Sequence, residues 1–169
     1  MVPAVVLLAG EQRREAALER AAREPVAGET RVDVDGREVR TPVVYAQVPP
    51  VGGDHDPVWQ RCGFYTAPVR AENAVASLAR GAVWVTYEPD LPSDQVELLR
   101  RLSGDGWSLV VSPFAGLPTP VVASAWGVQV TLPDARDERL EVFVRRYQDG
   151  AQAVRSGDAC QGGTDAPLG

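Results

Sequence analysis

The stretch GGDHDPVWQRCGFYTAPVRAENAVASLARGAVWVTY, residues 52–87, decides the fold because it passes from a loop into a helix and then into a strand. Its first part is rich in Gly, Pro and Asp, which favour loops. From Glu72 to Arg80 the apolar residues follow helical spacing, and Gly81 ends the pattern. The β-branched and aromatic run GAVWVTYEP, residues 81–89, predicts a strand. A helix followed closely by a strand is therefore expected near the centre of the chain.

Further helix and strand patterns lie on both sides of this stretch. RVDVDGREVR, residues 31–40, places alternating valines around an Asp-Gly pair, which predicts a hairpin of two antiparallel strands. The patterns at residues 91–106 and 134–150 predict helices, and the one at 107–113 predicts a strand. Residues 120–133 predict a strand pair or one long bent strand with a break at Gly127. Together these patterns predict an α+β fold: a mixed or mostly antiparallel sheet with helices packed on one face.

The chain of 169 residues is expected to divide into three parts. Residues 1–28 predict an N-terminal helical extension, since Glu and Arg recur there at helical spacing. Residues 29–150 are interpreted as a single α+β domain, because 44% hydrophobic content is enough for one core of ordinary size. Residues 151–169, rich in Gly, Ala and Asp, predict a mostly flexible tail.

Composition excludes several classes of function. A net charge of -6 argues against a nucleic-acid partner, which needs clustered basic residues. All 17 basic residues are Arg, so Schiff-base and P-loop lysines are excluded. The N-terminal run MVPAVVLLAG lacks a signal peptide's charged start and is shorter than the roughly 20 residues of a membrane span. We expect no membrane span and a cytoplasmic location, with an extracytoplasmic one as the alternative if the true N-terminus carries an export signal or anchor.

Two cysteines, Cys62 and Cys160, are too few for a metal knuckle and do not form a C-x-x-C pair. Two readings stay open from the residues alone. In an exported protein the cysteines would form a disulfide that closes a loop of about 100 residues. In the cytosol they would stay reduced.

Several blocks carry a family resemblance: WQRCGFY at residues 59–65, AVWVTYEPDLP at 82–92, AWG at 125–127 and CQGG at 160–163. In these blocks the chain resembles the domain-of-unknown-function family 3105, common in actinobacteria. The family pattern has one loop histidine and two more, four residues apart, on a presumed helix. Only His55 is kept here, while Ala76 and Arg80 occupy the helical positions. The chain is thus interpreted as a divergent member without the two helical histidines.

The resemblance has three implications. It includes both cysteine positions, which favours a Cys62–Cys160 disulfide that pins the tail at Cys160. Two imidazoles one helical turn apart can chelate a cation, and the loss of both leads us to expect no metal and no cofactor. Family members often carry an N-terminal membrane anchor.

The same positions suggest a rebuilt pocket for an anionic or enolisable small molecule. His55 is the candidate general acid or base, since histidine ordinarily titrates near neutral pH. Asp56 or Glu72 would orient its ring, and Arg80 or Tyr65 would stabilise developing negative charge. Substrate contacts are assigned to Trp59, Tyr65, Ala76 and Trp126. The plain alternative is that Arg80 pairs with Glu72, Asp54 or Asp56, while His55 caps a loop.

Three functions follow in order of preference. The first is a soluble, metal-free small-molecule-handling protein, a cofactor-independent acid/base catalyst of cyclisation, rearrangement or elimination in specialised metabolism. The second is a non-catalytic extracytoplasmic binding or assembly domain with a disulfide. The third is a residual metal-binding protein that uses His55 with carboxylates. The sequence leaves the oligomeric state and the substrate open.

Overall fold

A computed structural model describes residues 4–167, with side chains from Leu8 onward. Within this range the elements are α1 (Ala4–Ala21), β1 (Thr30–Arg31), β2 (Gly63–Phe64), α2 (Ala71–Ala79), β3 (Val83–Tyr87), α3 (Ser93–Ser103), β4 (Leu109–Pro113), β5 (Val121–Ala125), β6 (Val128–Leu132) and α4 (Glu138–Tyr147). The expected helices and strands after residue 70 are thus present, and the α+β class is confirmed.

One mixed sheet of six strands organises the molecule, in the order β1-β6-β5-β3-β4-β2. β3 is parallel to β4 and antiparallel to β5, which forms a hairpin with β6. Gly127, at φ 70°, supplies the left-handed conformation of the tight connection between β5 and β6. Every residue of β3, β4 and β5 is buried, which explains their nearly continuous apolar sequences.

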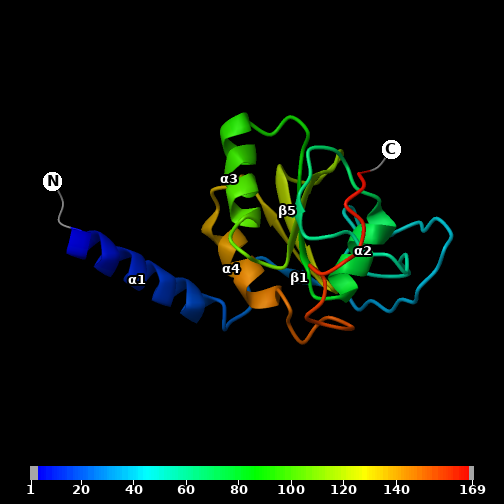
Figure 1. Ribbon diagram of the computed structural model, residues 1–169, viewed down its shortest axis with the longest axis horizontal. Coiled ribbons are helices and arrows are strands. Elements are labelled where there is room, and N and C mark those ends of the chain that lie inside the picture. Colours follow the sequence, from blue (N-terminus) through cyan, green and yellow to red (C-terminus); the bar gives the residue numbers. More distant parts are fainter. Residues whose placement is uncertain (1–3, 168–169) are drawn as a thin grey trace.

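Helices cover both faces of this sheet, which corrects the expectation of helices on one face (Figure 1). Side chains alternate along a strand, so Val83 and Val85 face the larger core with α3 and α4. Trp84 faces the other way and packs with Val75 and Leu78 of α2. Both faces of β3 are buried, because helices pack on each side.

The expected hairpin at residues 31–40 does not form. β1 is only two residues long and pairs with β6, while Glu38 bridges in parallel with His55. A side chain in place of Gly36 would overlap the backbone carbonyl of Gly53. This glycine therefore allows a close approach to the loop at residues 52–54 instead of forming a tight turn.

The N-terminal helix α1 extends away from the rest of the molecule (Figure 1). Ion pairs join it to α4: Arg14 pairs with Glu141 at 2.6 Å, and Arg145 pairs with Glu15 at 2.7 Å. Among residues 4–167 the structure has no helix of the length and apolarity that a membrane span requires.

The segment after α4 folds back over α2 without regular helix or strand. The backbone N–H of Arg155 donates to the Ala79 carbonyl at 2.8 Å, and Ala159 is buried in the α2 core. Further on, Thr164 forms an isolated bridge with Gln60. Residues 1–3 of the expected extension and 168–169 of the expected tail lie outside the described range.

Candidate functional site

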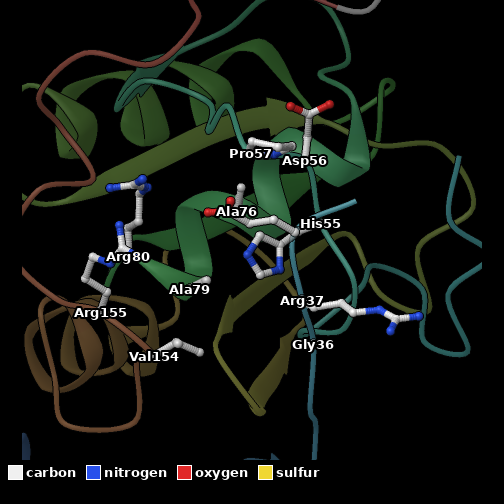
Figure 2. Close-up of a pocket in the computed structure, with 11 residues that line it drawn as sticks. Gly36, Arg37, His55, Asp56, Pro57, Ala76, Ala79, Arg80, Val154 and Arg155 are labelled. Carbon is white, nitrogen blue, oxygen red and sulfur yellow. The ribbon is translucent and has the colours of Figure 1, made fainter. Parts of the chain in front are cut away.

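A cavity of about 290 Å³ lies between α2, the His55 loop and the returning C-terminal segment. Four segments line it: Gly36, Arg37 and Glu38; His55, Asp56 and Pro57; Ala76, Ala79 and Arg80; and Val154 and Arg155. Small-molecule sites span roughly 300–1,000 Å³, so the cavity lies just below the small end of that range. Figure 2 shows the His55 ring directed toward the space between α2 and the segment that carries Val154 and Arg155.

His55 is held firmly by its backbone and its ring. Its N–H donates to the Arg37 carbonyl at 3.0 Å, and its carbonyl accepts from the Val39 N–H at 2.8 Å. Nδ1 lies 2.9 Å from the Gly53 carbonyl oxygen, and since a carbonyl only accepts, Nδ1 is the donor. Nε2 is therefore the ring nitrogen left for a bound molecule. The edge of the ring meets Trp126 at a centroid distance of 5.7 Å, and the residue is 8% exposed.

The two carboxylates expected to orient His55 bond elsewhere, which corrects that assignment. Asp56 Oδ1 accepts the Val58 N–H at 2.8 Å, and Glu72 Oε1 accepts the Val43 N–H at 3.1 Å. Each also lies within ion-pair distance of Arg70, at 3.5 and 3.6 Å. Both carboxylates thus hold loops against the start of α2, and the Gly53 carbonyl orients the imidazole.

Arg80 has a partner that sequence reasoning did not propose. Its guanidinium pairs with Asp158 at 2.6 Å and stacks on Trp59 at 3.6 Å from the ring centre. Its side chain is only 13% exposed. Arg80 lines the cavity, but its charge is already compensated, and pairing with Glu72, Asp54 or Asp56 is not observed. Its role here is to attach the returning segment to α2.

Of the four expected substrate contacts, only Ala76 lines the cavity. Trp126 supports the cavity from behind His55. Trp59 lies beneath Arg80 and is not among the lining residues. Tyr65 is also elsewhere: its hydroxyl donates to the Arg61 carbonyl at 2.7 Å, and burial raises its pKa. Tyr65 is therefore not part of the His55 site.

Sequence reasoning missed Glu38 and Arg155. The parallel bridge between Glu38 and His55 brings the backbone of Glu38 next to that of His55, and the bond from the Arg155 N–H to the Ala79 carbonyl brings Arg155 to α2. Neither lies in a recognisable motif. The one signal for Arg155 was its position shortly before Cys160, since a disulfide there returns the tail to the domain.

Cys62 and Cys160 form a disulfide with their Cα atoms 4.7 Å apart, as the family resemblance implied. Cys62 lies just before β2, so the bond fastens the returning segment to the α2 side of the sheet. Among the residues that the structure describes, no three His, Cys, Asp or Glu side chains converge as a metal site.

The fold and site define a mixed-sheet α+β domain with one disulfide and a small histidine-lined cavity. The chain belongs to the family described as "Protein of unknown function (DUF3105)", whose model matches residues 37–162. This range includes His55, α2 and both cysteines, and it excludes α1. A search of curated proteins and a search of solved structures each gave no match.

Proposed function

We propose that this protein binds a small organic molecule in the cavity beside α2 and that His55 transfers a proton to or from it. The observation that carries the proposal is the state of His55: a buried imidazole whose Nδ1 is fixed by the Gly53 carbonyl and whose ring faces the cavity. A fixed tautomer and a free Nε2 are what a general acid or base needs.

The cavity supports a small ligand. Ala76 and Ala79 leave space along α2, and Val154 adds apolar surface opposite them. Proton removal at one atom and return at another would serve a cyclisation, rearrangement or elimination. Such chemistry needs no cofactor, and the proposal invokes none.

His55 is the single histidine of the chain, so its imidazole gives one unambiguous set of NMR signals. We would titrate the protein with a panel of small carboxylic acids, amines, amino acids and ketones. Members that enter the cavity should shift these signals. In Ala76→Leu, which narrows the cavity, the shifts should weaken.

Proton transfer needs its own readout. Enolisable ketones that shift the His55 signals would be incubated in D₂O, and deuterium incorporation at carbon would be followed by NMR. Exchange should fall to background in His55→Gln. If no member of the panel shifts the His55 signals, the binding proposal is wrong; if members bind and exchange in His55→Gln equals that of the parent, the acid/base role is wrong.

The disulfide favours a second function: a non-catalytic binding or assembly domain in an extracytoplasmic compartment. Disulfides persist in oxidising compartments and are rare in the cytosol. Free thiols would be counted in protein taken from its own cells with rapid alkylation. No free thiol would support the extracytoplasmic location, whereas two free thiols would support the cytoplasmic one.

A further inference from the structure

We infer that the ligand of the His55 cavity is a small zwitterion, a molecule with both a carboxylate and an ammonium group, held by Arg155 and Glu38. The inference rests on the proposed binding function and names the class of ligand. It comes from the charged side chains that line the cavity, which are Arg37, Glu38, Asp56, Arg80 and Arg155 besides His55.

Three of these charges are already compensated within the protein. Arg80 pairs with Asp158 at 2.6 Å, and Arg37 lies 3.8 Å from Asp54. The third, Asp56, lies 3.5 Å from Arg70. None of the three therefore requires an opposite charge from a ligand.

Glu38 and Arg155 remain. Among the side chains that the structure describes, neither takes part in an ion pair. Backbone hydrogen bonds hold the main chain of both residues in place. The N–H of Val39, the residue after Glu38, donates to the His55 carbonyl, and the Arg155 N–H donates to the Ala79 carbonyl. Both residues are exposed, so the cavity presents one carboxylate and one guanidinium that are solvated by water and have no ion-pair partner in the described part of the chain, together with the His55 imidazole.

This arrangement discriminates between classes of ligand. A simple carboxylate would gain from Arg155 but would be repelled by Glu38, and a simple amine would meet the reverse. A neutral molecule would gain no ion pair from either side chain. Only a ligand with both groups satisfies both side chains, and an Arg guanidinium suits a carboxylate because it donates two parallel hydrogen bonds.

The remaining lining residues set the size and character of the rest of the ligand. Three lining residues are apolar: Ala76, Ala79 and Val154. Together with the charged residues they enclose a volume of about 290 Å³. An amino acid with a small or medium aliphatic side chain fits these properties. Figure 2 shows Arg155 and Val154 on the side of the cavity across from His55.

Three molecules of nearly equal shape test the inference: leucine, 4-methylpentanoate, which lacks the ammonium group, and 3-methylbutylamine, which lacks the carboxylate. Alanine, propanoate and ethylamine form a smaller set. Dissociation constants would come from the shifts of the His55 signals. We expect the zwitterion to bind at least fivefold tighter than either partner of its set.

Variants assign the two charges. Arg155→Gln should weaken leucine binding at least fivefold and leave 3-methylbutylamine binding unchanged or tighter. Glu38→Gln should weaken leucine binding similarly and leave 4-methylpentanoate binding unchanged or tighter. Arg61→Gln, an exposed change outside the cavity, is the control and should change nothing.

The outcomes separate this inference from the proposed function. If 4-methylpentanoate or the amine binds as tightly as leucine, or if none of the six probes binds while other members of the wider panel do, the zwitterion inference is overturned and the binding function stands. If neither the six probes nor the wider panel shifts the His55 signals, both fail.

Discussion

Replacing both Cys62 and Cys160 with serine should lower the free energy of unfolding by about 4.7 kcal/mol at 25 °C. The bond joins residues 98 positions apart. In the chain-entropy model, a closed loop of that length lowers the conformational entropy of the unfolded chain by an amount equivalent to about 4.7 kcal/mol. Cys160 is exposed and Cys62 half-buried, so the serine side chains add little packing cost.

The folded chain should survive this change because other bonds hold the returning segment. Thr164 N–H donates to the Trp59 carbonyl at 2.9 Å, and Arg61 N–H donates to the Thr164 carbonyl at 2.8 Å. The Arg80–Asp158 pair also remains. The loss should therefore arise mainly in the unfolded state and appear in global unfolding.

Urea unfolding followed by Trp fluorescence gives the measurement. With a slope of about 2 kcal/mol per molar urea, the midpoint should fall by a little over 2 M. Wild-type protein kept reduced should match the double variant, and oxidised wild type should show no free thiol. A midpoint shift below about 0.5 M, or early proteolysis after Gly150 with the midpoint unchanged, would refute the reasoning, because the segment would then unfold by itself.

Three further substitutions, two of them paired with a control substitution, test the packing and charges. Arg80→Gln should lower the free energy of unfolding, measured with urea, by about 2 kcal/mol, a value between those of exposed and buried ion pairs. Arg37→Gln is the control: its parent side chain is 85% exposed, and it should lower the free energy of unfolding by less than about 0.5 kcal/mol. Equal losses in the two variants would contradict the role of Arg80 in attaching the returning segment to α2. Leu78→Ala, at a fully buried position, should lower the free energy of unfolding by about 3 kcal/mol, as measured by thermal unfolding. Its control, Leu98→Ala, at a position that is 38% exposed, should lower it by less than about 1 kcal/mol. A hydrogen-bonded arginine lowers the pKa of Asp137 below its ordinary 3.8, so this carboxylate stabilises the fold above about pH 4, and its contribution is lost as the pH falls further. The Asp137→Asn variant should therefore lose less stability than the parent between about pH 5 and pH 3. Equal losses would show that the Asp137 carboxylate does not contribute to the pH dependence of stability.

The elements from residue 71 onward could be predicted because their signals are local. Helical spacing in residues 71–80 and unbroken apolar runs in the strands are set by burial of each element. The face that each helix covers could not be predicted in this way. Trp84 shows the reason: an apolar residue on the second face of β3 accepts a helix there, but the strand sequence does not say which helix.

The site was predicted less completely, for a related reason. His55 and Ala76 were found through the family pattern, and the structure brings both to one cavity. The partner of the His55 ring is a backbone carbonyl, which has no sequence signature. Arg80 and Asp158 are 78 residues apart, so their pairing depends on the path of the whole chain.

The returning segment explains why Arg80 cannot have the role that its sequence position suggests. Asp158 lies five residues before the end of the C-x-G-G block and neutralises Arg80, while Arg155, three residues earlier, places a second guanidinium at the cavity. The same segment thus removes one cation from the site and supplies another. Both effects require its path over α2, which the disulfide fixes at Cys160. Even so, a ligand that pairs with Arg155 should bind the folded double serine variant nearly as tightly as the parent, because the Arg80–Asp158 pair and the bond from the Arg155 N–H to the Ala79 carbonyl hold the segment without the disulfide.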